Sequence, residues 1–408
     1  MSRLLSICIG IVIFIYILNL FKVLRAHRAV VRKECWFEQQ PDKMASFYMI
    51  IPVYKEQERI EECINTIEKI CWDKENLTVC ICTTEKEAMD GNDTESICRR
   101  LLSQNHYRYQ YEIVRYPYTN GNMAEQVNYA FSKCPEHIDY ISVYNADSVI
   151  NPDVLKLVSK EFGNKEINYI QQRAIYNNYT GSNIFSTGYI FFQSIFEMKK
   201  NIVNDMAGKG QNVVGRALFI RKSALGESIY PTEFYCEDMA LSMNLVNQGQ
   251  RIGGVTVFEV NEPPAKLKDI INQQYVWFHT ASKVGDLAEY ARTHTESGRL
   301  TPKACIKICS RIVDNLVWLF TSVILLVLSV LWLPLFPITY LYCLIMVIAF
   351  DECFRLRSKK SMFTDAICYQ IYLYTVSLGP IKCIIKTIGA SMGLDVHDHK
   401  YKTPRGER

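Results

Sequence analysis

The sequence predicts an α/β domain with a mostly parallel sheet, held to a membrane by apolar helices at both ends. Three observations support this fold class. Short apolar runs alternate with amphipathic stretches between residues 45 and 262, a pattern typical of strands alternating with helices. Two long apolar segments flank this region, one near the N-terminus and one after residue 310. Polar and acidic residues gather directly after several of the apolar runs, where parallel sheets bind ligands.

The first apolar segment, Leu4 to Phe21, is uncharged and just long enough to cross a bilayer as a helix. Only Arg3 precedes it, whereas a group of cations follows: Lys22, Arg25, Arg28, Arg32 and Lys33. Because cationic flanks stay in the cytoplasm, we expect the N-terminus outside and the following domain inside the cell. A cleaved signal peptide is the alternative, but its cations would precede the apolar run and a small-residue cleavage site would follow it.

The second apolar segment, Leu316 to Phe350, carries no charge and would be about 50 Å long as one helix. This exceeds a hydrocarbon core of about 30 Å, and Pro334 and Pro337 interrupt the segment near its middle. We therefore predict a transmembrane hairpin with its tip outside. Cations return the chain to the cytoplasm: Arg355, Arg357, Lys359 and Lys360.

A shorter apolar stretch, Ala366 to Ile381, is broken by Gly379-Pro380 and predicts an interfacial or re-entrant helix. The polar tail that follows is expected in the cytoplasm. The predicted units are residues 1–33 (transmembrane helix and basic flank), 45–262 (α/β domain), 263–310 (interfacial helices), 311–360 (transmembrane hairpin and basic loop), 361–394 (interfacial or re-entrant helix) and 395–408 (cytoplasmic tail).

Composition excludes several classes of function. A net charge of +4 over 408 residues, without a basic stripe interleaved with aromatic residues, gives no support for nucleic-acid binding. The 15 cysteines are scattered and include no two pairs with zinc-ligand spacing, which favours a reducing compartment over a disulfide framework or structural zinc.

Within the central region, four runs are expected to be strands: Phe47 to Val53, Leu77 to Thr83, Tyr111 to Val114 and Tyr140 to Tyr144. Three stretches between them have helical periodicity: Glu56 to Ile70, Ser96 to Leu102 and Met123 to Phe131. Polar clusters follow the first, second and fourth strands. A single acidic residue at such a point is commonly only a helix cap, but three clusters in one sheet indicate a binding site.

Four motifs lie in this order along the chain: Ile51-Pro52-Val53-Tyr54-Lys55-Glu56, Tyr144-Asn145-Ala146-Asp147-Ser148, Phe234-Tyr235-Cys236-Glu237-Asp238 and Gln273-Gln274-Tyr275-Val276-Trp277. Together they resemble the membrane-bound family 2 glycosyltransferases, the group of cellulose, chitin and hyaluronan synthases. The resemblance covers roughly residues 45 to 310 and the flanking apolar segments. It implies a GT-A fold, a nucleotide-sugar donor, a divalent metal ion and inversion at the anomeric carbon.

On the donor side, the resemblance implies that Pro52, Tyr54 and Glu56 lie where the family's opening strand meets the nucleotide. Thr83 and Glu85 lie in the stretch where the family places its next base-binding carboxylate.

The stretch around Asp147 resembles the family's D-x-D metal motif, with Asn145 in place of the first Asp. A hard carboxylate oxygen suits Mg²⁺ or Mn²⁺ beside a diphosphate, so Asp147 is the expected metal ligand and both residues are expected to bind the donor. The structural alternative is a turn at a strand end with a capping Asp.

The Glu237-Asp238 pair resembles the family's acidic motif at a helix start. The resemblance implies that Asp238 is the catalytic base that deprotonates the acceptor hydroxyl, with Glu237 as the weaker candidate. A pair of acidic residues favoured by the helix dipole is the structural alternative.

The Gln273 to Trp277 stretch resembles the family's Q-x-x-R-W, with Val276 in place of Arg. The resemblance implies that Gln273 and Trp277 help bind the acceptor and the diphosphate, and that Arg216 lies near an acceptor-site motif. Trp277 could also simply anchor a helix at the membrane surface. Two further stretches resemble family motifs, residues 120–128 with Met123 in place of Lys, and the basic tail 399–405.

The resemblance implies an inverting, metal-dependent hexosyltransferase, and the apolar segments and their charged flanks place it in the plasma membrane with its catalytic domain in the cytoplasm. Its partners would be a nucleotide sugar, most simply a UDP-sugar, and a lipid-linked or polysaccharide acceptor. Two alternatives stay open: a single-step transferase onto a polyprenyl phosphate, and a catalytically silent subunit of a polysaccharide synthesis or export complex. The replacements at Asn145, Met123 and Val276 favour the silent subunit, whereas the intact Glu237-Asp238 pair favours the enzyme.

Overall fold

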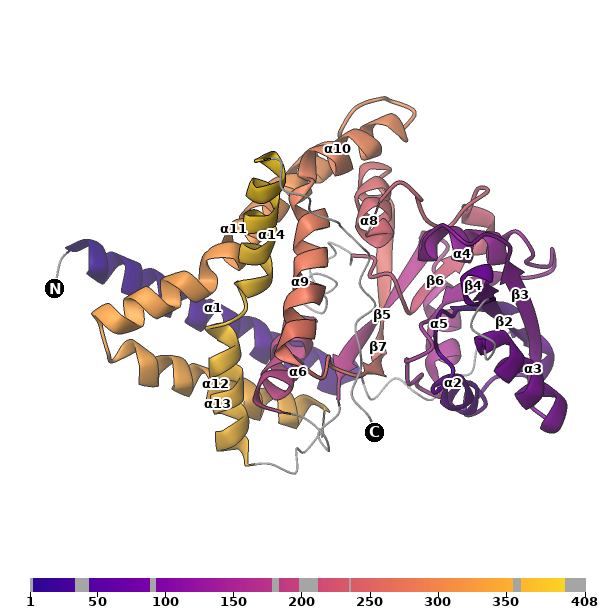
Figure 1. Ribbon diagram of the computed structural model, residues 1–408, viewed down its shortest axis with the longest axis horizontal. Helices are drawn as coiled ribbons and strands as arrows, with labels where there is room; N and C mark the ends of the chain where they lie inside the picture. The colour runs from indigo at the N-terminus through magenta and orange to yellow at the C-terminus, as the bar shows by residue number, and fades with distance from the viewer. Residues whose placement is uncertain are drawn as a thin grey trace.

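The computed structural model describes residues 3–33, 44–88, 93–177, 183–197, 212–234, 236–354 and 361–392. Within these ranges, a sheet domain lies on one side of the molecule and a group of long helices on the other (Figure 1). The basic loop after the hairpin, residues 355–360, and the tail 395–408 lie outside the described residues.

The described residues form a seven-stranded sheet in the order β3-β2-β1-β4-β6-β5-β7. Its pairs are parallel except at β6, which runs antiparallel to both neighbours, so the predicted mostly parallel sheet is confirmed. The strands are β1 (Phe47–Pro52), β2 (Leu77–Thr84), β3 (Gln110–Tyr116), β4 (Tyr140–Val143), β5 (Ile167–Tyr176), β6 (Leu218–Arg221) and β7 (Arg251–Asn261).

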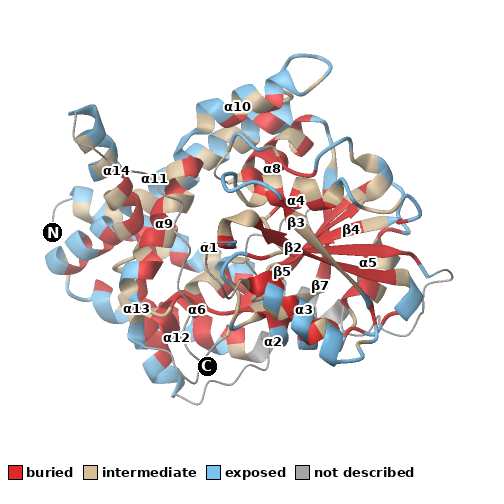
Figure 2. Ribbon diagram, turned by 45° about the vertical axis from the view of Figure 1, so that its right-hand side comes forward, coloured by how far each residue is buried: buried red, intermediate tan, exposed pale blue. Residues whose placement is uncertain are grey.

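Helices cover both faces of this sheet, which explains why β1 is apolar at every position rather than at alternate ones. Phe47, Met49 and Ile51 pack toward α2 (Ile60–Ile67), α3 (Thr94–Gln104) and α5 (Val154–Glu161). Tyr48 and Ile50 pack on the opposite face, toward α4 (Met123–Phe131) and α8 (Glu237–Asn247). Each such buried side chain contributes about 1.5–3 kcal/mol to stability. The buried strands stand out in Figure 2.

The element bounds agree closely with the predicted ones, with one informative difference. α4 begins and ends where predicted, because Asn122 and Glu125 form a capping box at its start. α2, by contrast, begins only at Ile60, although its periodicity extends back to Glu56. The backbone of Lys55 has a positive φ of 56°, which turns the chain before a helix can start.

Within the described residues, the helical part of the molecule consists of α1 (Arg3–Lys33), one helix between β5 and β6, and the helices that follow β7. Its described helices are α6 (Ile184–Glu197), α9 (Leu267–Ser282), α10 (Val284–Thr293), α11 (Pro302–Leu331), α12 (Leu335–Phe354), α13 (Met362–Leu373) and α14 (Leu378–Ser391). A helical hairpin forms between α11 and α12, with Pro334 in the connection and Pro337 in the first turn of α12. The apolar part of α12, Leu335–Asp351, is shorter than a candidate membrane span, so the transmembrane character of the hairpin stays a prediction.

Three segments of the described chain are long and apolar enough to cross a membrane: Arg3–Arg25, Pro302–Leu331 and Met362–Ser391. The segment Met362–Ser391 contains the stretch Ala366 to Ile381, for which the sequence predicts an interfacial or re-entrant helix. The whole segment is long and apolar enough to be a candidate span as well. The chain there is divided between α13 and α14, and Gly379-Pro380 lies in the first turn of α14 rather than in the break.

Candidate active site

The loop after β4 carries Asn145 and Asp147 and is fixed to the sheet at both of its ends. Tyr144 is fully buried at its start, and its hydroxyl donates to Gln172 of β5. At its end, Val149 exchanges two backbone hydrogen bonds with Val260 of β7, at 3.0 and 3.1 Å. Asn145 and Asp147 are half-buried between these anchors, which place them at the carboxyl end of β4 as the sequence predicted.

A buried ion pair lies directly behind this loop. The carboxylate of Glu259, on β7, is fully buried and accepts a hydrogen bond from Nε of Arg216 at 2.7 Å. Ser148, next to Asp147, donates to the same oxygen at 3.4 Å, and Asn261 donates to it at 2.5 Å. Burial raises the pKa of Glu259, and the neighbouring Arg216 guanidinium opposes part of this rise.

The charge of Asp147 also acts on both members of this pair. It raises the pKa of Glu259 and adds to the rise in the pKa of Arg216, so the three groups share one electrostatic environment. Arg216 is held further by Tyr176, whose hydroxyl accepts from Nη2 at 3.1 Å and whose ring centroid is 5.6 Å from the guanidinium carbon.

The residue before Arg216 connects this cluster to the predicted catalytic base. The backbone N–H of Gly215 donates to Oδ2 of Asp238 at 3.0 Å, and the N–H of Met239 donates to Oδ1 at 2.7 Å. Asp238 and Glu237 occupy the first turn of α8, where the helix dipole stabilises negative charge. The fold therefore brings Asp147, Arg216 and Asp238 to one edge of the sheet through short contacts.

Tyr230 lies beside the acidic pair and was not singled out from the sequence. Its side chain is buried, and burial together with the charges of Glu237 and Asp238 raises its pKa. Asn128, in the stretch that resembles a family motif, accepts from the N–H of Ile229 and Tyr230 and donates to the Tyr230 carbonyl. Helix α4 thus holds the segment that leads to the Glu237-Asp238 pair.

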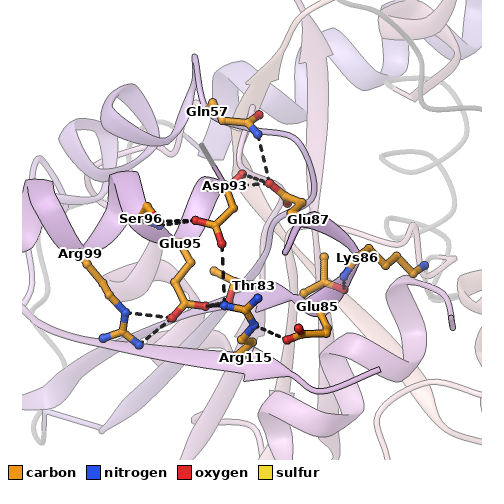
Figure 3. Close-up of polar contacts among 12 residues, drawn as sticks. Gln57, Thr83, Glu85, Lys86, Glu87, Asp93, Glu95, Ser96, Arg99 and Arg115 are labelled. Atoms are coloured by element: carbon orange, nitrogen blue, oxygen red, sulfur yellow. Dashed lines mark hydrogen bonds and ion pairs between the residues drawn. The ribbon is translucent and has the colours of Figure 1, made fainter. Parts of the chain in front are cut away.

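The predicted donor residues after β1 depend on a buried carboxylate, Glu87. One of its oxygens accepts from the N–H of Lys55 at 2.8 Å. The other accepts from Gln57 Nε2 at 3.2 Å and from the N–H and hydroxyl of Thr94 at 3.0 and 2.7 Å (Figure 3). Because Lys55 lies between Tyr54 and Glu56, Glu87 sets the path of the predicted nucleotide-binding turn.

Pro52 is the last, half-buried residue of β1, and Tyr54 is exposed at the sheet edge. The ammonium groups of Lys55 and Lys86 lie 5.6 and 5.9 Å from the Tyr54 ring centroid. Glu56 is fixed by its backbone, whose N–H donates to Thr94.

Thr83, near the end of β2, and Glu85, directly after β2, are engaged with the protein itself. The Thr83 hydroxyl is buried and donates to Glu95 at 3.0 Å, and Glu85 accepts from Arg115 at 2.5 Å (Figure 3). Arg115 also bonds Glu95 at 3.1 Å, so these groups form one network along the end of β3.

Toward the long apolar helices, Gln273 of α9 accepts from the hydroxyl of Tyr189 at 2.7 Å. The Tyr189 ring packs edge-on against Tyr176, at a centroid distance of 5.2 Å. Since Tyr176 holds Arg216, two tyrosines connect Gln273 to the site. Trp277 lies one turn further along α9 and is half-buried.

Sequence reasoning missed Glu259, Glu87, Tyr176 and Tyr230. Only Glu259 carries a signal in the sequence, because it is a single acidic residue inside the otherwise uncharged run Ile252 to Asn261. An acidic side chain in a buried strand requires a polar or charged partner. The sequence therefore predicts that Glu259 is paired, but it does not identify Arg216 as the partner.

The described residues suit a metal ion that arrives with a diphosphate. They contain no group of three or more His, Cys, Asp or Glu side chains arranged to hold a metal. Mg²⁺ and Mn²⁺ in phosphate sites are commonly bound by only one or two protein carboxylates, with substrate phosphates and water as the other ligands. Asp147, with Asn145 as a neutral oxygen beside it, fits that smaller role.

The parallel sheet and the acidic residues at its edge define an α/β domain of the nucleotide-binding type. A family model for glycosyl transferase family group 2 matches residues 140–351, and one for glycosyl transferase family 2 matches residues 48–226. The first match covers more than half of the chain, so the protein belongs to glycosyl transferase family group 2. No protein of curated function matches the sequence.

One solved structure supports the fold, and a second is similar at a lower score. A mannosyltransferase from Pyrobaculum calidifontis, PcManGT in complex with GDP-Man and Mn²⁺, is similar with a TM-score of 0.53 at 14% identity, over 90% of this chain and 98% of that one. TarS residues 1–349 from S. aureus gives a TM-score of 0.39 at 12% identity, over 81% and 90% of the two chains. The domain has the GT-A fold, as the resemblance implied.

Proposed function

We propose that this protein is a membrane-embedded, inverting glycosyltransferase that uses a nucleotide sugar on the cytoplasmic face. The acceptor is a lipid-linked glycan or a growing polysaccharide that approaches along the apolar helices. A UDP-sugar is the first donor to test, and GDP-sugars follow because the structurally similar mannosyltransferase was solved with GDP-Man and Mn²⁺.

One observation carries this proposal. Gly215 and Arg216 join the two acidic positions of the site, since Gly215 bonds Asp238 and Arg216 pairs with Glu259 behind the Asp147 loop. Sugar transfer needs one carboxylate near the diphosphate and another near the acceptor hydroxyl, and both must have fixed positions. The Gly215-Arg216 connection provides this fixed relation.

Asp147 and Asn145 would hold the divalent metal against the diphosphate of the donor. The metal, when bound, neutralises the charge that develops on the leaving nucleoside diphosphate. Arg216, whose charge is partly balanced by Glu259, lies at the same edge, and we assign its guanidinium to the diphosphate or the acceptor. This assignment offers a cation in place of the one that Val276 removes from the Q-x-x-R-W motif.

Asp238 would act as the general base. The acceptor oxygen forms a bond to the anomeric carbon, the bond from that carbon to the diphosphate breaks, and the acceptor proton passes to the carboxylate. The two N–H groups that bond Asp238 orient the carboxylate before the reaction.

The donor and metal assignments are tested together. Detergent-purified protein is titrated with a panel of UDP- and GDP-sugars in the presence of Mn²⁺, Mg²⁺ or a chelator. Binding of one donor that the chelator abolishes is the expected result. Folded protein that binds no donor would instead favour the silent-subunit alternative.

The base is tested with Asp238→Asn, which keeps the shape of the side chain but removes its basicity. We expect donor affinity to stay within about twofold and transfer to fall by about 10²–10⁴-fold. Glu237→Gln serves as the matched comparison on the same helix turn. Wild-type transfer by Asp238→Asn would overturn the assignment.

A further inference from the structure

The side chain of Lys86 crosses from the loop after β2 to two neighbouring loops at the carboxyl edge of the sheet. Its ammonium donates to the carbonyl of Gly121, in the turn before α4, at 2.5 Å. The same ammonium lies 5.9 Å from the ring centroid of Tyr54, which follows β1. Figure 3 shows Lys86 directed away from the adjacent Glu85, which turns toward Arg115. Lys86 is therefore separate from the network at the end of β3.

The loops around this ammonium are fixed by buried or tight contacts. Glu87, next to Lys86, is buried and accepts from the N–H of Lys55 in the loop after β1. Gly121 has a positive φ of 104°, and an added Cβ would lie 2.7 Å from the hydroxyl of Tyr116, so only glycine fits this turn. The three loops therefore have set positions, and the ammonium of Lys86 lies among them.

The contacts of Lys86 with the protein do not neutralise its positive charge. A carbonyl oxygen and an aromatic ring both attract a cation, but both are uncharged. Within the ranges that the structure describes, Lys86 forms no ion pair with a carboxylate. The residue is half-buried, so an anion bound there is held more strongly than at an open surface.

The ammonium also lies toward the part of the edge where the diphosphate is expected. Lys86 follows β2, but its ammonium reaches the ring of Tyr54, which follows β1. β1 also pairs with β4, whose loop carries Asp147, so the cation lies about one strand spacing, about 4.8 Å, nearer to that loop than β2 does. The stretch 120–128 has Met123 where the resembled motif has Lys, and Lys86 brings a cation to the turn just before that position.

We propose that Lys86 binds the diphosphate of the nucleotide donor, alongside the metal ion at Asp147. An ammonium group has three hydrogens, so one can stay on the Gly121 carbonyl while another bonds a phosphate oxygen. The inference rests on the proposed function, because it adds a binding residue to the same donor site.

The test compares nucleoside diphosphates with the nucleosides that lack the charge. The full chain in neutral detergent with Mn²⁺ is titrated with UDP and with GDP, and uridine and guanosine are measured by competition. Lys86→Met keeps most of the side-chain length and removes the charge. It should bind the diphosphate about tenfold more weakly than the wild type, because a charge-assisted contact is lost, and the nucleoside equally well. The affinity of the wild type for the diphosphate should also fall more steeply with added salt.

Two further variants are the controls. Lys86→Arg keeps the positive charge and should lose less affinity than Lys86→Met. Lys133→Met also removes an ammonium over a tyrosine ring, 5.1 Å from the centroid of Tyr129, but at the opposite end of α4 from Gly121. It should bind the diphosphate as the wild type does. All three variants should melt within about 2 °C of the wild type, as surface changes usually do.

The outcomes separate this inference from the proposed function. Equal affinity of Lys86→Met and the wild type for the diphosphate would overturn the inference alone. A lower melting temperature of Lys86→Met, with equal losses of affinity for nucleoside and diphosphate, would also overturn it, because Lys86 would then only tether the loops. Folded wild-type protein that binds neither UDP nor GDP would overturn the proposed function and the inference together.

Discussion

The buried ion pair behind the Asp147 loop allows a quantitative prediction about Arg216→Met. Methionine fills much of the volume of the arginine stem but carries no charge, so the change leaves the carboxylate of Glu259 buried without its cation. The side chains of Glu259 and Arg216 are 0% and 14% exposed, so water compensates little of the loss.

Removal of one partner from a buried ion pair costs about 3–5 kcal/mol of stability. For a domain of this size, each kcal/mol lowers the melting temperature by about 2–4 °C. The melting temperature of Arg216→Met should therefore fall by about 6–20 °C at neutral pH. Melting followed by near-UV circular dichroism in detergent, at one scan rate, measures this change.

The fall in melting temperature caused by Arg216→Met should be larger at high pH than at low pH. Burial already raises the pKa of Glu259, and removal of the guanidinium that opposes this effect raises it further. A carboxyl group with a raised pKa in the folded state contributes stability below its unfolded pKa, and this contribution is lost as pH rises through the folded pKa. The difference between variant and wild type should thus be larger at pH 8 than at pH 5.

A second variant makes this reasoning refutable. Arg216→Met/Glu259→Gln removes the stranded charge and should recover most of the lost melting temperature at pH 8. The reasoning fails if the double variant melts as low as Arg216→Met, or if the loss caused by Arg216→Met is the same at both pH values.

Three further changes test other parts of the structure. Asp147→Asn should weaken metal-dependent donor binding by about tenfold or more, because a charged metal ligand becomes neutral; an unchanged Mn²⁺ titration at fixed donor would contradict this. Glu87→Ala should cost about 3 kcal/mol and weaken donor binding, since Lys55 loses the carboxylate that fixes its turn; thermal melting and donor titration check both effects. Gly379→Ala should cost about 1–3 kcal/mol, because the new methyl group meets Gln274 at 2.5 Å, and melting in detergent measures it.

Matched controls separate these effects from general ones. Glu227→Ala removes an exposed carboxylate, and Gly226→Ala adds a methyl group where no atom lies within 4 Å. Both should melt within about 2 °C of the wild type, as surface changes usually do. Equal losses in the controls would remove the support for specific roles of Glu87 and Gly379.

The sequence by itself determined the type and order of the main elements in the first half of the domain. Apolar runs such as β1 and β2 are buried on both faces, so their hydrophobicity is continuous and visible without a structure. The start of α4 was equally readable, because a capping box is a local interaction between residues three apart. The same locality made Asp147 and Asp238 recognisable, since each belongs to a short motif at the end or the start of an element.

The tertiary structure decided which of these residues meet. Glu259 and Arg216 are 43 positions apart and Gln273 and Tyr189 are 84 apart, and no local pattern pairs such residues. The late start of α2 has a similar cause. Glu87, 32 positions along the chain, accepts a hydrogen bond from the N–H of Lys55 and holds the turn that precedes the helix. Periodicity reports which face of a segment is apolar, whereas ion pairs and close helix crossings depend on how segments pack. The sequence therefore determined the fold class and the acidic motifs, and only packing decided the buried pair behind Asp147 and the close crossing of α9 and α14 at Gly379.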